Sequence, residues 1–367
     1  MDKRIVLASA GAGKTFYVAN DFKAEERVIL ISFTNSNVAN IRKEIHKRFN
    51  GEVPENVQIM TYDSFIYNNL LKPVEPLFLS NISTKVNIKD KPVEDPRVFG
   101  YKRVDTHEHY MDSNNAYYVN RMAKLFLTFY QNEKNIVLDR LYQYCDAIYF
   151  DEFQDYNGYD FKLLKFFLEK SKLKVVAVGD INQSCITPLR SAGNNIAKNP
   201  FHKIKNVDDL KKLFSDKVHF DEITLEETRR VPKITCEMIK VNLNINIVSK
   251  SDVDASIIYL KNIDEINDIV TNVNIPKLIW DKRTTHPIGK NYVNWTYSKG
   301  DTYPTACVIL TNTVSNIEKW TSITSLKTRN SLYVALTRSK GDLYLITSND
   351  YKKWRKHADS KQRSHDI

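Results

Sequence analysis

The run Ala8-Ser9-Ala10-Gly11-Ala12-Gly13-Lys14-Thr15 carries the pattern that decides the fold. An apolar run precedes it and a helical pattern follows it, which is the order of a phosphate-binding loop. Gly11 and Gly13 let backbone N–H groups close around phosphate oxygens at the positive end of the next helix. Lys14 is placed to reach β- and γ-phosphates, and the hydroxyl of Thr15 to bind Mg²⁺. The run therefore predicts a nucleotide site lined by Ala10, Gly11, Ala12, Gly13, Lys14 and Thr15.

Length and composition are those of an ordinary globular protein. The chain has 367 residues, of which 42% are hydrophobic and 27% are charged, which excludes disordered and collagen-like classes. Four cysteines stand far apart without a Cys-x-x-Cys pair, which excludes zinc ribbons, iron–sulfur clusters and disulfide scaffolds. A net charge of +10 favours a polyanionic partner. No apolar run approaches the ~20 residues that span a bilayer, and we expect a cytoplasmic protein without a membrane partner.

Short apolar runs rich in β-branched residues alternate with helical patterns along the whole chain. Such runs are typical of strands buried on both faces of a parallel sheet, so the pattern predicts an α/β fold built twice. We expect a first domain over 1–71 and 136–195 and a small insertion over 72–135. A second domain is expected over 196–351, followed by a basic, flexible tail over 352–367.

A second signature follows the apolar run Ile148–Phe150, as Asp151-Glu152-Phe153-Gln154-Asp155. An acidic residue at the carboxyl tip of a strand beside a phosphate loop is where Mg²⁺ needs a ligand. Asp151 is expected to hold the metal through water, and Glu152 to polarise the attacking water. Taken alone, the same pair of carboxylates is also compatible with a solvated turn.

At Asp151–Asp155 the sequence resembles the UvrD/Rep-like group of superfamily 1 helicases, whose ATPase motifs follow one another in a fixed order. The loop at Ala8–Thr15 resembles the version found in that group, which also tolerates alanine at the first position. Six further stretches resemble motifs of the group in the same order: Ser32–Ser36, Thr61–Phe65, Val178–Ser184, Leu225–Arg230, Thr296–Gly300 and Tyr333–Lys340.

The resemblance implies two RecA-like P-loop NTPase domains, each a parallel β-sheet flanked by helices, with ATP between them. It also implies that Gln183 senses the γ-phosphate, Arg230 contacts a phosphate and Arg338 is the arginine finger. Gly300 belongs to the motif that joins the DNA and nucleotide sites. The implied catalytic set is Lys14, Asp151, Glu152, Gln183, Arg230 and Arg338.

The resemblance further implies contacts with single-stranded DNA. The polar side chains expected to bond phosphates in the first domain are Thr34, Asn35, Thr61 and Ser64. Tyr62 and Phe65 are expected to stack on bases, although Phe65 is equally compatible with a core position in the next helix. In the second domain, the resemblance implies DNA contacts from Thr296 and Ser298.

The sequence departs from the group at several positions. Arg229 stands where the group usually has a tyrosine that packs on the base, and Thr302 replaces a glutamate implicated in ribose contact. The stretch after Gln183 lacks the aromatic pair that stacks on bases. Only 65 residues lie between Arg230 and Thr296, which leaves no room for the large second-domain insertion. The resemblance is therefore to a minimal form of the helicase.

Two functions from different classes follow. The first is an ATP- and Mg²⁺-dependent translocase or helicase on single-stranded DNA or tailed duplex, with 3′→5′ movement implied by the resemblance. The alternative is a nucleotide-gated DNA-binding subunit of a larger replication, repair or defence complex, without autonomous unwinding. A third possibility, an RNA-directed motor, is less favoured by Asp151–Asp155.

Overall fold

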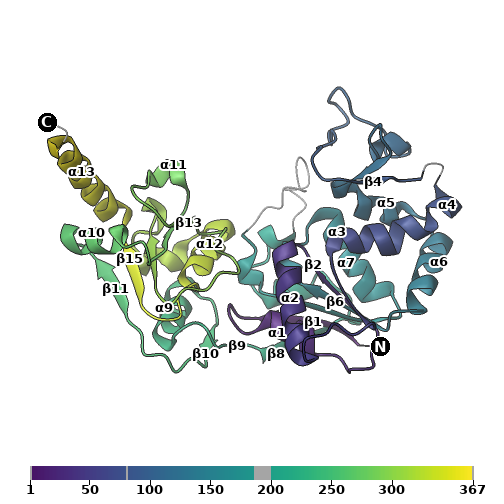
Figure 1. Cartoon of the computed structure of the whole chain (residues 1–367), viewed down its shortest axis with the longest axis horizontal. Helices are drawn as coiled ribbons and strands as arrows, with labels where there is room; N and C mark the ends of the chain where they lie inside the picture. Colours follow the sequence, from purple (N-terminus) through teal and green to yellow (C-terminus); the bar gives the residue numbers. More distant parts are fainter. Residues whose placement is uncertain (1, 80–81, 186–199, 366–367) are drawn as a thin grey trace. The chain divides into compact units, whose positions relative to one another are not determined.

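The computed structural model describes residues 2–79, 82–185 and 200–365 (Figure 1). The chain divides into two compact units. Unit 1 comprises Met1–Leu7, Lys14–Ile181 and Thr187–Ile223, and unit 2 comprises Ala8–Gly13, Asn182–Ile186 and Thr224–Ile367. The expected domain boundary between residues 195 and 196 lies outside the described residues, and the assignment of roles to the domains stays a prediction.

Unit 1 is built on a six-stranded sheet in the order β3-β2-β6-β7-β1-β8. The neighbours from β3 to β1 pair in parallel. Every residue of β2 and β6 is buried, because both faces of these apolar strands are covered. The strands are β1 (Lys3–Ala8), β2 (Val28–Ser32), β3 (Val57–Thr61), β6 (Ala147–Asp151), β7 (Lys174–Gly179) and β8 (His219–Leu225). This sheet confirms the predicted α/β class.

Helices connect these strands, and their apolar sides form the core of unit 1. The ring of Phe65 packs 6.2 Å from Phe150 and 5.6 Å from Phe167, so a helix after β3, the central strand β6 and the following helix share one aromatic cluster. The helices are α1 (Lys14–Asn20), α2 (Asn35–Arg48), α3 (Tyr62–Phe65), α6 (Gln131–Tyr142), α7 (Gly158–Lys170) and α8 (Val207–Lys211). A π-helical segment over Ile66–Leu71 continues α3.

The segment expected as an insertion, residues 72–135, has a small sheet of its own. Its strands β4 (Lys85–Asn87) and β5 (Ala116–Tyr118) pair in parallel, and its helices are α4 (Glu75–Phe78) and α5 (Met122–Thr128). Phe126 of α5 packs 5.5 Å from Phe166 of α7, so apolar rings join the segment to the rest of unit 1.

Unit 2 contains a five-stranded parallel sheet in the order β11-β15-β14-β12-β13. Its strands are β11 (Ile257–Leu260), β12 (Lys277–Ile279), β13 (Tyr292–Asn294), β14 (Ala306–Ile309) and β15 (Leu343–Ile346); β9 (Glu227–Thr228) and β10 (Val248–Ser249) pair separately. Its helices are α9 (Lys233–Leu243), α10 (Ile263–Thr271), α11 (Lys282–Thr285), α12 (Leu326–Leu336) and α13 (Ser348–His365). The second parallel sheet again agrees with the predicted class.

The structure differs from the sequence expectation at the carboxyl-terminal tail. The sequence predicts a flexible tail over 352–367, but α13 runs from Ser348 to His365. Tyr351 and Trp354 are buried, with their rings 5.3 Å apart, and they anchor the first turns against unit 2. Burial of two large aromatic side chains supplies the tertiary packing that helices generally require for stability.

Candidate nucleotide and nucleic-acid site

The phosphate loop has the backbone that its glycines permit. Gly11 and Gly13 have φ values of +79° and +93°, a region that other residues rarely adopt. A Cβ on Gly11 would also lie 2.8 Å from the Thr228 hydroxyl and 2.6 Å from the Cβ of Arg230, both in unit 2. Glycine at residue 11 is therefore required twice, by conformation and by close approach.

The same loop makes specific backbone contacts within unit 2. The N–H of Ala10 donates to the hydroxyl of Tyr333 at 3.1 Å, and the N–H of Ser9 donates to the carbonyl of Leu225 at 2.9 Å. Ala10 is fully buried beside Tyr333 in the core of unit 2. The conformation of the loop therefore depends on these contacts as well as on its own sequence.

In unit 1 the structure brings Lys14, Asp151 and Glu152 together. Lys14 begins α1, and its Nζ lies 3.6 Å from Oε2 of Glu152. Asp151 ends β6 and is 2% exposed, and its carboxylate accepts a hydrogen bond from Ser32 at the end of β2, at 3.2 Å. Thr15 lies beside Lys14 in the first turn of α1. The carboxylate of Asp151 and the hydroxyl of Thr15 are oxygen ligands of the kind that Mg²⁺ prefers.

Glu152 occupies a left-handed backbone conformation, with φ of +53°. A residue other than glycine in this region is often held there by its surroundings at a functional position. The amide of Gln154 donates to the carboxylate of Glu152 and thereby orients it. Together these features direct an acidic side chain from the tip of a buried strand toward Lys14.

Gln154 is a residue of this site that the sequence reasoning did not assign. Its Oε1 accepts the N–H of Asp180 at 3.0 Å, so the side chain joins the end of β6 to the end of β7. A Cβ on Gly179 would overlap Gln154 Oε1 and lie 2.6 Å from Phe153. The sequence signal for this contact is Gly179 at the end of β7, because the absence of a Cβ there lets the turn after β6 lie against β7.

Gln183 lies in a 3₁₀ turn, Ile181–Gln183, and is 3% exposed. The division of the chain groups it with unit 2, where the neighbouring Asn182 accepts a hydrogen bond from Arg329 at 2.9 Å. Its expected role toward a γ-phosphate stays a prediction.

The two predicted arginines have protein partners within unit 2. Arg230 donates to the hydroxyl of Thr302 at 3.3 Å. Arg338 is 1% exposed, and its guanidinium donates to the carbonyls of Val334, Ser298 and Asp301 and to the hydroxyl of Thr337. These contacts bring Arg338 to the loop that contains Gly300, whose φ is +94°. The role of Arg338 as an arginine finger stays a prediction.

The polar residues expected to contact DNA in unit 1 cluster at one edge of the sheet. Ser32 pairs with Thr61 across the parallel strands β2 and β3, so the segments that follow both strands begin side by side. The hydroxyl of Thr34 caps α2 by accepting the N–H of Asn37 at 3.1 Å, and Asn35 is exposed beside it. Thr61 and Ser64 are joined by a 2.9 Å hydrogen bond between their hydroxyls. Strand ends of this kind are the usual ligand-binding edge of a parallel sheet.

The aromatic side chains expected beside them are placed differently. Tyr62 and Phe65 are both fully buried. The ring of Tyr62 packs 4.9 Å from Tyr156, and that of Phe65 packs in the aromatic cluster. Neither ring presents a face to solvent, so this structure does not offer them for base stacking, and the core position left open for Phe65 is the one observed.

In unit 2, Thr296 and Ser298 follow β13. Thr296 donates from its hydroxyl to Asn294 at 2.7 Å, while Ser298 is fully buried and donates to the carbonyl of Trp295 at 2.7 Å. Tyr297 between them is 78% exposed and is the aromatic side chain available there. Sequence reasoning missed it because exposure is not visible in the motif.

A cavity of about 680 Å³ lies in unit 2 at the carboxyl ends of β12, β14 and β15. Its lining includes Trp280, Arg283, His286, Thr311, Thr313 and Lys352. No acidic side chain of the described residues lines it. Cationic side chains beside hydroxyls are suited to phosphate oxygens.

Another residue not assigned from the sequence is Phe16, which follows Thr15 in α1 and is 59% exposed. Large aromatic side chains are usually buried in part, so an exposed one beside a phosphate loop is informative. No group of three or more histidine, cysteine, aspartate or glutamate residues that could hold a metal occurs among the described residues.

The structure is that of an α/β protein with a glycine-rich loop after β1, a strand that pairs in parallel with β7. A family model described as an AAA domain matches residues 2–187, just over half of the chain. The chain belongs to this AAA domain family. No helix in the described part of the chain has the length and apolar character needed to span a membrane.

Two solved structures are similar to the chain at low identity. The crystal structure of arterivirus nonstructural protein 10, a helicase, matches with 15% identity and a TM-score of 0.46, over 94% of this chain and 59% of that one. The complex of that protein with DNA matches with 14% identity and a TM-score of 0.47, over 94% and 60%. The chain thus spans about three fifths of the length of these proteins. A comparison with curated proteins finds no match.

Proposed function

We propose that this protein is an ATP-dependent motor of the UvrD/Rep-like superfamily 1 class that moves on single-stranded DNA in the 3′→5′ direction. The observation that carries the proposal is the cluster of Lys14, Asp151 and Glu152 at the same sheet edge as Thr34 and Thr61. Membership of the AAA domain family, which occurs in UvrD/Rep-like helicases, supports nucleotide hydrolysis.

In the proposed reaction, Lys14 and the backbone of the loop bind the nucleotide phosphates. Asp151 and Thr15 would hold Mg²⁺, and the ion would supply positive charge beside the phosphoryl oxygens. Glu152, held by Gln154, accepts a proton from the water as a general base. The water oxygen bonds to the γ-phosphorus, the bond from that phosphorus to the bridging oxygen breaks, and ADP and phosphate leave. Arg230 and Arg338 are proposed to contribute positive charge to the transition state, and Gln183 to contact the γ-phosphate.

The proposed DNA contacts are divided between the units. In unit 1, Thr34, Asn35, Thr61 and Ser64 bond phosphates. In unit 2, Thr296 bonds a phosphate, Tyr297 supplies a stacking ring, and the cavity with Arg283 and Lys352 binds phosphates. Ser298 acts by holding the turn after β13, because its hydroxyl is already used.

The test combines DNA-stimulated ATPase with displacement from 3′- and 5′-tailed duplexes. We expect stimulation by single-stranded DNA and displacement only from the 3′-tailed substrate, with Lys14→Ala abolishing both activities while DNA binding persists. ATP hydrolysis that is unaffected by Lys14→Ala would sink the proposal. A comparison of ATPase stimulation by single-stranded DNA and RNA of equal length shows which nucleic acid the protein acts on.

The second candidate is a nucleotide-gated DNA-binding subunit of a larger replication, repair or defence complex. The short spacing between Arg230 and Thr296 and the burial of Tyr62 and Phe65 favour it, because both reduce the means of gripping a strand. Hydrolysis that requires a partner chain, with no displacement by the purified protein, would support this candidate over the first.

A further inference from the structure

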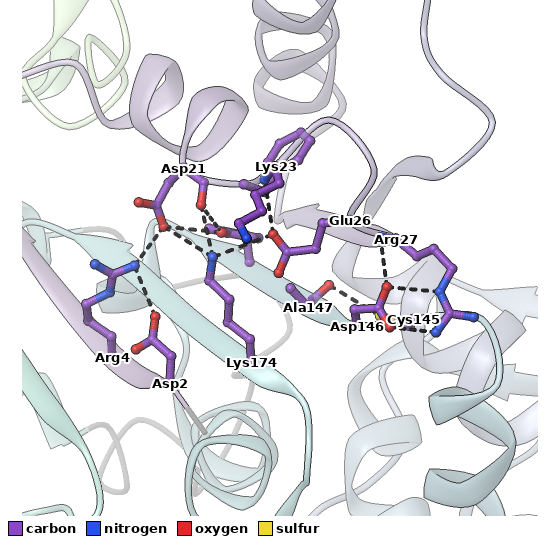
Figure 2. Close-up of polar contacts among 12 residues, drawn as sticks. Asp2, Arg4, Asp21, Lys23, Glu26, Arg27, Cys145, Asp146, Ala147 and Lys174 are labelled. Atoms are coloured by element: carbon purple, nitrogen blue, oxygen red, sulfur yellow. Dashed lines mark hydrogen bonds and ion pairs between the residues drawn. The ribbon is translucent and has the colours of Figure 1, made fainter.

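A network of charged residues lies at the amino ends of the strands of unit 1 (Figure 2). Its centre is Asp21, the residue directly after α1. Arg4 of β1 donates to Oδ2 of Asp21 at 2.7 Å, and the Nζ of Lys174, the first residue of β7, lies 3.9 Å from the same oxygen. The carboxylate is therefore held by cations from two neighbouring strands.

The backbone of Asp21 is held as well. Its carbonyl accepts the hydroxyl of Tyr149 at 2.5 Å and the Nζ of Lys174 at 3.0 Å. Tyr149 is a fully buried residue of β6, and burial, together with the charge of Asp21, raises the pKa of its hydroxyl. The hydroxyl consequently remains protonated and acts as a donor. One residue thus receives side chains from three adjacent strands.

The opposite ends of these three strands carry the candidate nucleotide site. β1 ends at Ala8 of the phosphate loop, β6 ends at Asp151, and β7 ends at Gly179. Arg4, Tyr149 and Lys174 therefore connect the end of α1 to the strands whose other ends hold the loop and the acidic pair. A short, fully paired strand transmits position along its length because every residue is fixed by its ladder.

Helix α1 depends on such contacts. It has seven residues, about 10 Å of helix, which is too short to be stable without tertiary packing. Arg48 of α2 donates to the carbonyls of Ala19 and Phe22, at 2.8 and 2.5 Å, and so satisfies groups at the end of the helix. Asp21 adds the attachment to the sheet, which determines where Lys14 lies along it.

We propose that Asp21 is a positioning residue of the nucleotide site: its attachment to Arg4, Tyr149 and Lys174 fixes α1 so that Lys14 and Thr15 face the end of β6. The inference rests on the proposed function, because Asp21 can position Lys14 and Thr15 for nucleotide only if the protein binds nucleotide there. Asp21 acts through the helix, and its carboxylate is bonded at the opposite end of the sheet strands from the loop.

The test compares Asp21→Asn with a matched control at the same edge of the sheet. Asp146 binds Arg27 through two charged hydrogen bonds, of 2.9 and 2.5 Å, and Arg27 does not belong to α1 (Figure 2). Asp146→Asn therefore weakens a carboxylate–arginine pair outside the helix, and this pair is more exposed (41% and 43%) than the Arg4–Asp21 pair (21% for both side chains). Titration with a fluorescent ATP analogue, DNA binding without nucleotide, and the melting temperature are measured for both variants.

We expect Asp21→Asn to weaken binding of the analogue on the order of tenfold and to raise KM for ATP, because a misplacement of about 1 Å is costly at such sites. Asp146→Asn is expected to change the same affinity less than about twofold at a similar melting temperature. DNA binding without nucleotide is unchanged in both. Equal nucleotide affinities for the two variants would overturn the role of Asp21 and leave the proposed function standing.

Lack of nucleotide binding by the unaltered protein would instead overturn the proposed function, together with this role. If Asp21→Asn does not fold, Lys174→Gln replaces it, because it removes one donor to the carbonyl of Asp21 and keeps the carboxylate. A loss of nucleotide affinity in Lys174→Gln supports the proposal, and an unchanged affinity contradicts it.

Discussion

Lys14 of the phosphate loop and Glu152 at the tip of β6 form an ion pair, with 3.6 Å between Nζ and Oε2. Both side chains are mostly buried, at 10% and 14% exposure, so the charges are poorly screened by water. In the proposed reaction Lys14 binds phosphate and Glu152 binds water. Nucleotide binding must therefore separate the pair, and this separation frees the carboxylate for its role as a base.

Substitution of Glu152 by Gln should consequently divide binding from hydrolysis. The neutral amide releases Lys14, so we expect nucleotide affinity that is unchanged or higher. The turnover number should fall by ~10²–10⁴-fold, the usual contribution of a general base. Single-turnover hydrolysis and titration of an ATP analogue measure the two effects separately. Lys14→Ala serves as the control and should lose both, while full turnover in Glu152→Gln contradicts the assignment.

Phe16 should contribute to nucleotide affinity through its exposed ring. It stands directly after Thr15 and is 59% exposed. Arg229 stands where the proposed resemblance to UvrD/Rep-like helicases would place a tyrosine that packs on the base. Removal of a stacked aromatic ring costs ~1–3 kcal/mol, so Phe16→Ala should raise the KM for ATP by roughly 5- to 150-fold. Phe16→Tyr, which keeps the ring, is the control. Competition by tripolyphosphate, which has no base, should be equal in all three proteins.

Salt dependence should test the phosphate contacts that are proposed for the cavity in unit 2. Removing one cationic side chain that binds a phosphate of single-stranded DNA reduces the slope of log K against log salt by about 0.7. We expect this reduction in Arg283→Gln and in Lys352→Gln, measured by fluorescence anisotropy at several salt concentrations. Lys282→Gln removes the same charge from a neighbour that does not line the cavity. An equal change in Lys282→Gln means that the effect comes from net charge alone.

Gly179→Ala should destabilise unit 1. The added methyl group overlaps Gln154 and approaches Phe153, so the turn after β6 must move. Overpacking of this kind costs ~1–3 kcal/mol, which urea denaturation can measure. Gly289→Ala is the comparison, because nothing lies within 4 Å of the added carbon there. Any loss of stability in Gly289→Ala comes from its φ of +91° and not from overpacking. ATP hydrolysis should fall in Gly179→Ala only, since Gln154 orients Glu152.

The insertion should lose stability in mild acid through His109, which is 1% exposed. Burial first, and then the charges of Arg121 and Lys124, lower its pKa to about 4. The imidazole is held neutral, with Nδ1 against the carbonyl of Lys102 at 2.7 Å and Nε2 accepting from Lys124 at 2.8 Å.

Because the folded pKa lies below the unfolded value near 6.5, the unfolded chain binds the proton more tightly. The contribution is complete above pH 6.5 and is lost as the pH falls from 6.5 toward 4. Thermal melts over this range should fall less steeply in His109→Gln than in the unaltered protein. His107→Gln, at an exposed histidine in the same turn, should leave the slope unchanged.

The parallel sheets could be predicted from the sequence because each strand is a short apolar run between polar residues. Ile148–Phe150 and Val175–Val178 are both buried in neighbouring strands, as the runs indicate. The backbone conformation of the phosphate loop could also be predicted, because glycine residues such as Gly11 and Gly13 readily adopt positive φ values. Local signals of this kind need no knowledge of the partner.

Other features depend on tertiary contacts between residues that are distant in the sequence. Nothing local separates the buried Tyr62 from the exposed Tyr297, because each follows a threonine in a motif. The contacts of Asp21 join residues 17 to 153 positions away in the chain, and only the order of the strands brings them together. The charge of the tail predicts flexibility, whereas Tyr351 and Trp354 hold α13 in place.

Arg48 has a mechanical consequence. Arg48 is the last residue of α2, whose first residue, Asn35, is a proposed DNA contact. Its guanidinium donates to carbonyls at the end of α1, the helix that begins at Lys14. Arg48 thus connects the carboxyl-terminal ends of the two helices. A DNA strand bound at Asn35, as proposed, would therefore be connected to the phosphate loop through the backbones of the two helices and the guanidinium of Arg48.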